Sequence, residues 1–263
     1  NNMIYFSSEM KSFFEIKEFS KKPNINFIDE YLYTQKISGT NTIYSQINEV
    51  EPGYIIKIST LNGKISSSSY YSLENTFNKN KLISNKTEEL YELMKEAVLS
   101  RCIADVPFGA LLSGGIDSSL ILSYMLESDN INKVNCYFAD VKNQKRSESS
   151  AAFKVTSFLE KKYQNKKIKL KSKKNNFSSY IDLLIKTTKS FDEPVHYSNS
   201  PDLLNIVNQA SQDGIKVLLS GEGADELFFG YDRMVRAYES LKNKRSKRLI
   251  IEEMYFGGGK HSI

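Results

Sequence analysis

The spacing of apolar and polar residues differs between the first part of this chain and the rest. Up to about Tyr71, short extended runs such as MIYFSS and YIIKIST are separated by turn signals, among them Pro52-Gly53 and Asn62-Gly63. The second pair lies between YIIKIST and KISSSSYYS and predicts a β-hairpin turn. A polar stretch without a sustained period, ISSSSYYSLENTFNKN, follows. We expect a domain boundary near residues 75–85, dividing 1–80 from 81–263; an ordinary surface loop is the alternative interpretation of this stretch.

From Thr87 onward, helical and extended patterns alternate. TEELYELMKEAVLSRC predicts a helix capped by Thr87, with an apolar face made of Leu90, Leu93, Met94, Ala97 and Val98. Strands are predicted at GALLS, KVNCYFAD, KKIKLKS and IKVLLS. Helices are predicted at SSLILSYMLES, SESSAAFKVTSFLEKKY, NFSSYIDLLIKTTKSF and SPDLLNIVNQASQ, with a final long helix from about Ala224. This order predicts an α/β fold, a doubly wound parallel sheet covered on both faces and preceded by a partial α+β segment.

Composition narrows the class of protein. A chain of 263 residues that is 40% apolar can bury a core in one or two domains. No window holds 18 uninterrupted apolar residues, and charges run through the first twenty positions, so we expect neither a membrane span nor a signal peptide but a soluble, cytoplasmic protein. Cys102 and Cys136 form no CxxC and are interpreted as reduced structural residues. A net charge of +5 decides little by itself.

One strand-to-helix junction, LLSGGIDSSL at residues 111–120, has the composition of an anion-binding loop. Gly114 and Gly115 leave room for a close approach of the backbone, and the loop opens onto a helix N-terminus whose free amides and dipole favour phosphate. Three hydroxyls can add donors, those of Ser113, Ser118 and Ser119. An acid here, Asp117, makes sense beside a polyphosphate when Mg²⁺ lies between them. The alternative is a tight turn in which Asp117 or Ser118 only caps the helix.

A second junction, IKVLLSGEGADELFFGY at residues 215–231, repeats this design of strand, glycine turn and helix start. Taken singly, its acids can be interpreted as first-turn residues favoured by the helix dipole: Glu222, Asp225 and Glu226. A doubly wound sheet, however, binds ligands at the carboxyl ends of its strands, where the strand order reverses. If the first and fourth strands flank that switch, the two loops face each other, and Asp117 and Asp225 can share Mg²⁺ on one polyphosphate.

Both loops resemble those of a known family. The first lacks the lysine of a Walker A sequence, which argues against a kinase or GTPase, and Ser113–Ser118 resembles the SGGxDS loop of the PP-loop ATP pyrophosphatases, whose fold is adenine nucleotide alpha hydrolase-like. Ser220–Leu227 with Tyr231 resembles the SGEGADELFGGY sequence of the glutamine-dependent asparagine synthetases and departs from it at Phe229, where that family usually has Gly. RCIADVPFGALLSGG, FDEPVHYSNSPDLL and the opening YFSSEMKSF, which is similar to the end of the family's glutaminase domain, extend the resemblance over nearly the whole chain.

The resemblance implies a reaction and a set of roles. The aspartate side-chain carboxylate attacks the α-phosphate of ATP to give β-aspartyl-AMP and pyrophosphate, and ammonia, free or derived from glutamine, displaces AMP. Pyrophosphate would be held by Ser113, Gly114, Gly115, Asp117, Ser118 and Ser119. The nucleotide site would be lined by Leu112, Ala139, Ser220 and Gly221. Glu222 matches the acid that promotes formation of the acyl-adenylate, and Asp117 and Asp225 match the Mg²⁺ ligands. The implied partners are small molecules, with no membrane; a homodimer is one assembly that stays open.

Two departures from the family matter most. The chain begins at Asn1 rather than at the family's N-terminal cysteine, and no counterpart of the family's RVPFLD segment precedes Ile263. We therefore expect 1–80 to be the remnant of a glutaminase domain and 81–263 to be a C-terminally incomplete synthetase domain, and the missing ends argue against full synthesis by this chain alone. His196, in the FDEPVHY loop, is interpreted as incidental.

Three alternatives stay open at this point. The acceptor can be another carboxylate, as in β-lactam synthetase-like enzymes or polysaccharide amidotransferases. A tRNA-modifying PP-loop enzyme would fit the basic stretches KKYQNKKIKLKSKK and KNKRSKR, although SGEGADELFFGY and SSEMK argue against nucleic acid. A remnant that binds nucleotide without catalysis is the third.

Overall fold

The computed structural model describes residues 3–73, 75–76, 87–140, 148–174, 177–195 and 197–243. Contacts divide the chain into two compact units, one made of Asn1–Lys86 with Thr188–His196 and the other of Thr87–Thr187 with Tyr197–Ile263. The contact division thus falls close to the predicted boundary, but it also assigns a short segment from the middle of the chain to the N-terminal unit. The division into 1–80 and 81–263 stays a prediction.

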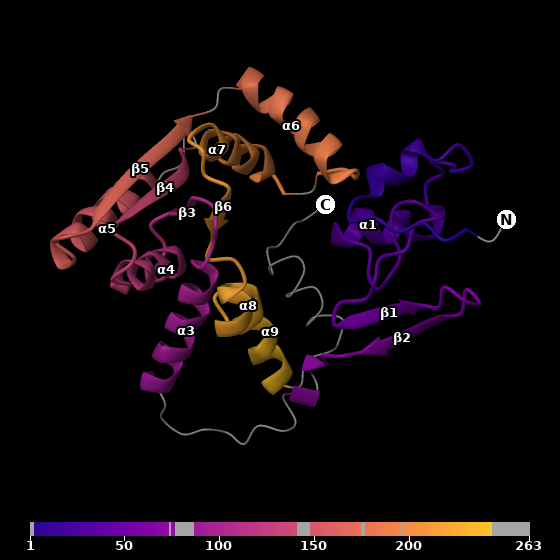
Figure 1. The fold of residues 1–263 in the computed structure, drawn as a ribbon, viewed down its shortest axis with the longest axis horizontal. Helices are drawn as coiled ribbons and strands as arrows, with labels where there is room; N and C mark the ends of the chain where they lie inside the picture. The colour runs from indigo at the N-terminus through magenta and orange to yellow at the C-terminus, as the bar shows by residue number, and fades with distance from the viewer. Residues whose placement is uncertain are drawn as a thin grey trace. The chain divides into compact units, whose positions relative to one another are not determined.

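The N-terminal unit contains short elements around one hairpin. These are η1 (Met10–Glu15), η2 (Ile25–Phe27), α1 (Ile28–Thr34), β1 (Tyr54–Ile58) and β2 (Ile65–Ser69) (Figure 1). The two strands pair antiparallel, and Ile58 lies opposite Ile65. Gly63 has a φ of 68°, the left-handed conformation that a tight hairpin turn requires and that glycine adopts without strain. The hairpin predicted at Asn62-Gly63 is therefore confirmed.

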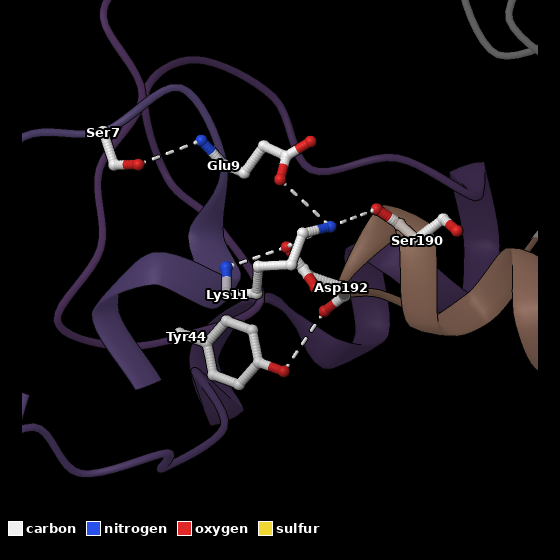
Figure 2. A network of polar contacts seen from close by, with 6 residues as sticks. All are labelled: Ser7, Glu9, Lys11, Tyr44, Ser190 and Asp192. Carbon is white, nitrogen blue, oxygen red and sulfur yellow. Dashed lines mark hydrogen bonds and ion pairs between the residues drawn. The ribbon is translucent and has the colours of Figure 1, made fainter. Parts of the chain in front are cut away.

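A polar network ties the segment 188–196 to the start of the chain within this unit (Figure 2). The Lys11 backbone N–H donates to Asp192 Oδ2 at 2.8 Å, and Lys11 Nζ donates to the Ser190 carbonyl at 3.0 Å and lies 3.2 Å from Glu9 Oε2. The Tyr44 hydroxyl donates to the Asp192 carbonyl at 3.1 Å. The Asp192 side chain is only 6% exposed, and the Lys11 N–H together with the Lys11 ammonium, 3.7 Å from Asp192 Oδ2, compensates a carboxylate that has lost most of its water.

The second unit is built on a parallel sheet. Its strands are β3 (Phe108–Leu111), β4 (Lys133–Asp140), β5 (Lys167–Lys174) and β6 (Val217–Leu219), in the order β5-β4-β3-β6. Its helices are α3 (Thr87–Arg101), α4 (Ile116–Glu127), α5 (Glu148–Lys162), α6 (Phe177–Phe191), α7 (Ser200–Gln212), α8 (Ala224–Phe228) and α9 (Asp232–Lys242) (Figure 1). The end of α6, from Thr188, belongs to the N-terminal unit. Successive strands run outward from β3 to β5, and the chain then returns to place β6 on the other side of β3. The switch point of the sheet therefore lies between β3 and β6, which fulfils the condition under which the two glycine loops were expected to face each other.

Helices cover both faces of this sheet. On one face, α4 and α5 bury Leu122, Met125 and Leu159 against Ala110, Val134, Cys136 and Phe138 of the strands. On the other face, α7 packs Ile206 and Ala210 against Tyr137. The β4 strand alternates between these two clusters, because successive side chains of a strand point to opposite faces. The expected doubly wound α/β fold is confirmed.

The helix predicted at α3 forms, but its predicted apolar face is only partly covered. Val98 packs on the core, whereas Leu90 and Leu93 are 44% and 56% exposed. The helix is fixed instead by Tyr91, whose ring lies 5.2 Å from the Tyr124 ring and whose hydroxyl donates to Glu127 Oε2 at 2.6 Å. The apolar period identified the helix but not the side chains that anchor it.

The prediction of one long helix from Ala224 is wrong, because two helices occupy this stretch. α8 ends at Phe228, and α9 begins at Asp232. Phe229 between them has a φ of 58°, and the Gly230 N–H donates to the Asp225 carbonyl at 3.0 Å. A left-handed residue at a helix end redirects the chain, which is why the helical pattern of the sequence does not continue as one helix.

None of the helices in the described ranges is long and apolar enough to cross a bilayer.

Candidate functional site

The first glycine loop joins β3 to α4 and is held from two sides. The Leu112 N–H donates to the Tyr137 carbonyl at 2.8 Å, which extends the pairing of β3 with β4 to the start of the loop. Gly114 has a φ of 83°, and a Cβ built there would lie 2.5 Å from the Ala152 nitrogen and 2.6 Å from the Ala151 carbonyl carbon. The backbone of α5 therefore packs directly onto this glycine. Any other residue at position 114 would be strained, both by its contacts with α5 and by the positive φ.

Serine hydroxyls order the rest of this loop. Ser113 Oγ accepts the Gly115 N–H at 3.3 Å and lies 3.2 Å from Ser118 Oγ. Ser119 Oγ donates to the Gly115 carbonyl at 2.6 Å. Gly115 itself is exposed and is the N-cap residue of α4, so the first-turn amides of that helix open onto the loop. The first-turn amides and the helix dipole therefore face the loop, and both suit an anion.

The second glycine loop follows β6 and touches the first. A Cβ built on Gly221 would lie 3.0 Å from the Asp117 Cβ, 3.1 Å from the Ser118 nitrogen and 3.3 Å from the Asp117 carbonyl carbon. Two segments about a hundred residues apart in the sequence thus meet at the switch point, because β3 and β6 are neighbours with Ala110 opposite Leu219. The convergence of the two loops follows from the strand order and the parallel register.

The residues predicted to line the nucleotide site lie at the carboxyl ends of three adjacent strands. Leu112 follows β3 and is fully buried, Ala139 is close to the end of β4, and Ser220 follows β6. Ala139 packs with the α7 cluster. Since β4, β3 and β6 are parallel neighbours, these three residues share one edge of the sheet. Glu222, in the second loop, is exposed.

Two adjacent acids in the first turn of α8 have different surroundings. A Cβ built on Gly230 would lie 1.7 Å from Asp225 Oδ1, so this carboxylate occupies the space that a side chain at Gly230 would need. Glu226 Oε1 accepts a hydrogen bond from the Tyr231 hydroxyl at 3.0 Å, and this bond raises the pKa of Tyr231. The sequence reasoning missed the part played by Gly230, although a glycine inside a helical pattern is a signal of a turn or a close approach.

Both cysteines pack in the hydrophobic core of the second unit. Cys136 is buried and Cys102 half-buried, both are free thiols, and burial raises the pKa of Cys136 to about 12. A cavity of about 360 Å³ lies in the N-terminal unit, and none of the predicted site residues is among those that line it: Met3, Tyr5, Phe13, Ile16, Glu18, Phe19, Gln46, Ile47 and Asn48. His196 and most of KNKRSKR fall outside the described residues.

The chain is an α/β protein with a doubly wound parallel sheet, and its two glycine loops meet at the switch point, which is where such sheets bind ligands. The family model described as asparagine synthase matches residues 89–255, and the model described as glutamine amidotransferase domain matches residues 1–71. The chain belongs to the asparagine synthase family.

Individual relatives agree with this assignment. A protein assigned as glutamine-hydrolysing asparagine synthetase 2 in Methanocaldococcus jannaschii is 30% identical over 243 residues, which is 90% of this chain and 44% of that protein. Glutamine-hydrolysing asparagine synthetase 1 of Bacillus subtilis is 28% identical over 235 residues, 88% of this chain and 35% of that protein. The chain therefore spans less than half the length of these two relatives. Among solved structures, an NH3-dependent NAD synthetase from Campylobacter jejuni has a TM-score of 0.38 and 12% identity, covering 68% of this chain and 99% of that one.

Proposed function

We propose that this chain carries the ATP-binding half of an amide-forming ligase of asparagine synthetase type. The observation that supports this most directly is the contact of Gly221 with Asp117 and Ser118, because it allows one polyphosphate to touch both loops. The family assignment gives the nucleotide as ATP. The helix N-terminus and serine hydroxyls of the first loop would bind the β- and γ-phosphates, through Ser113, Gly114, Gly115, Asp117, Ser118 and Ser119.

The proposed reaction has two steps. An oxygen of the aspartate side-chain carboxylate forms a bond to the α-phosphorus of ATP, and the bond from that phosphorus to its bridging oxygen breaks, so that pyrophosphate leaves. Ammonia then attacks the activated carbonyl carbon, the carbon–oxygen bond to AMP breaks, and the nitrogen loses a proton. Because a free carboxylate resists nucleophiles, the first step is what makes the second one feasible.

The chain's own residues would orient the first step. Leu112, Ala139, Ser220 and Gly221 lie at or just after the carboxyl ends of three neighbouring strands, where the adenosine and α-phosphate would extend away from the first loop. Donors fixed before the reaction begins stabilise charge that develops on the departing group without reorganising. Glu222 is exposed beside this position and is proposed to promote formation of the acyl-adenylate.

Asp117 and Asp225 are proposed to be the residues that would hold Mg²⁺ together with the phosphates of the nucleotide. Within the described ranges, no group of three or more His, Cys, Asp or Glu residues could hold a metal ion. This donor set fits Mg²⁺, which keeps several waters and takes one or two carboxylates together with substrate phosphates, rather than an all-protein cage. When bound, the ion would supply charge neutralisation for the leaving pyrophosphate.

Binding and exchange experiments test this proposal on the whole chain. We expect titration calorimetry to detect ATP in the presence of Mg²⁺ and the Asp117→Asn variant to bind at least tenfold more weakly. Exchange of labelled pyrophosphate into ATP should require L-aspartate and be lost in Glu222→Gln with nucleotide binding retained. Exchange supported by another carboxylate, such as L-glutamate, would reassign the acceptor. A chain that binds no nucleotide with or without Mg²⁺ would refute the proposal.

A further inference from the structure

The turn that follows α8 separates two neighbouring carboxylates. Asp225 and Glu226 are adjacent in the first turn of that helix, where the helix dipole favours both acids equally. Three residues join α8 to α9: Phe229, Gly230 and Tyr231. The left-handed Phe229 redirects the chain, so that the two residues after it lie beside the acids of the helix start.

Glu226 is engaged by the last residue of this turn. The Tyr231 hydroxyl donates to Glu226 Oε1 at 3.0 Å. The Arg233 guanidinium lies 4.5 Å from the centre of the Tyr231 ring, a cation–π contact that fixes the orientation of the tyrosine. A carboxylate that already accepts a hydrogen bond from an oriented phenol has less freedom to reorganise around a ligand.

Asp225 is confined by Gly230 instead. The Gly230 N–H donates to the Asp225 carbonyl at 3.0 Å, which brings the glycine Cα close to the aspartate side chain. A Cβ at Gly230 would lie 1.7 Å from Asp225 Oδ1 and 2.7 Å from Asp225 Cγ. Both distances are far inside van der Waals contact, so a side chain at Gly230 and the present position of the carboxylate exclude each other.

We propose that Gly230 is a positioning residue for the Asp225 carboxylate, and that the turn thereby reserves Asp225, rather than Glu226, for the metal-bearing polyphosphate. The inference rests on the proposed function, in which Asp225 is a Mg²⁺ ligand. Any side chain at Gly230 displaces the carboxylate by more than an ångström, and a misplacement of about 1 Å can lower the rate of a catalysed reaction by about a hundredfold.

The test measures binding of Mg²⁺–pyrophosphate to the whole chain by titration calorimetry. Gly230→Ala should raise Kd for pyrophosphate at least tenfold with Mg²⁺ present and leave the weaker Mg²⁺-free binding unchanged. Asp225→Asn should produce a similar loss, and adding Gly230→Ala to it should cause no further loss. Glu226→Gln is the matched control at the neighbouring acid and should keep Kd within about twofold of the wild type.

Stability gives a second measurement that does not depend on ligand. Because the steric conflict involves the Asp225 side chain, Asp225→Ala should restore part of the melting temperature that Gly230→Ala lowers. Wild-type affinity in Gly230→Ala, a further loss in the Asp225→Asn background, or a loss in Glu226→Gln as large as that in Asp225→Asn would each overturn the assignment. A wild-type chain that binds pyrophosphate equally with and without Mg²⁺ would instead reject the proposed metal site itself, and the role of Gly230 with it.

Discussion

Replacing Gly114 by alanine tests whether α5 packs on the first glycine loop as the structure describes. Two costs add at this position. A residue with a side chain at a φ of 83° loses about 1–2 kcal/mol relative to glycine. The added Cβ would also lie 2.5 Å from the Ala152 nitrogen and 2.6–2.7 Å from the carbonyl carbon and Cβ of Ala151, and such overpacking costs about 1–3 kcal/mol. We expect the free energy of unfolding to fall by about 3 kcal/mol.

Gly115→Ala is the matched control, since it makes the same change one residue later. A Cβ at Gly115 would meet only Ser113 Oγ, at 3.4 Å, and the φ of −72° is open to any residue. Losing a glycine at an N-cap costs no more than about 1 kcal/mol. Urea denaturation followed by circular dichroism should therefore separate the two variants by about 1 M in midpoint.

Ligand binding gives a separate measurement on the Gly115→Ala variant. Gly115→Ala is expected to fold like the wild type but to bind Mg²⁺–pyrophosphate at least tenfold more weakly, because its methyl group would lie on the exposed side of the loop. Equal urea midpoints for the two alanine variants would refute the packing of α5 on Gly114. Unchanged pyrophosphate affinity in Gly115→Ala would refute a close approach of phosphate to that residue.

Three other changes follow from the structure. Phe229→Gly should raise stability by about 1 kcal/mol, because the residue has a positive φ and a half-exposed side chain; a melting temperature equal to or below that of the wild type would contradict this. Glu127→Gln should cost about 1 kcal/mol at neutral pH, because burial raises the pKa of this carboxyl but hydrogen bonds from Tyr91, Lys95 and Tyr163 together outweigh burial and hold the pKa below its usual value. The hydrogen bonds stabilise only the ionised carboxylate, so this cost should shrink as pH falls below about 4.5 and vanish once pH is below the pKa of Glu127 in the folded protein. A cost independent of pH between 3 and 7 would argue against this explanation. Lys11→Met should speed hydrogen exchange in residues 188–196, because it removes the ammonium donor to the Ser190 carbonyl, whereas Lys17→Met should not; equal exchange in the two variants would show that this donor does not hold the segment.

The fold could be predicted further than the site. Alternating strands and helices with short connections permit few arrangements other than a parallel sheet, so the class followed from the pattern alone. The strand order could not be read from the sequence. It decides whether Gly221 meets Asp117, because only a neighbouring β6 brings the second loop to the first. The loops themselves could be found because glycine beside a helix start is a local chemical signal.

The apolar periodicity of the sequence did not predict contacts that depend on polar groups or on a reversal of the chain. The periodicity of α3 points to Leu90 and Leu93, yet its anchor is the hydrogen bond from Tyr91 to Glu127, which no apolar period encodes. Residues 188–196 contact the N-terminal unit through polar groups of Lys11 and Tyr44, which are far away in the sequence. The break after α8 was missed because Phe229 is a poor candidate for a left-handed conformation, which only about a few per cent of non-glycine residues adopt.

Some glycines of these two segments are required by folding, whereas one is explained better by ligand binding. Gly114 is required by its backbone conformation and by α5, Gly221 by the approach of Asp117, and Gly230 by the Asp225 carboxylate. Gly115 has none of these constraints: its φ is ordinary and its nearest contact is a flexible hydroxyl at ordinary distance. Folding therefore gives no strong reason for a glycine at the mouth of α4, where a side chain would lie against an incoming phosphate. Within the loop, the residue that the protein's own packing needs least is the one that phosphate binding would need most.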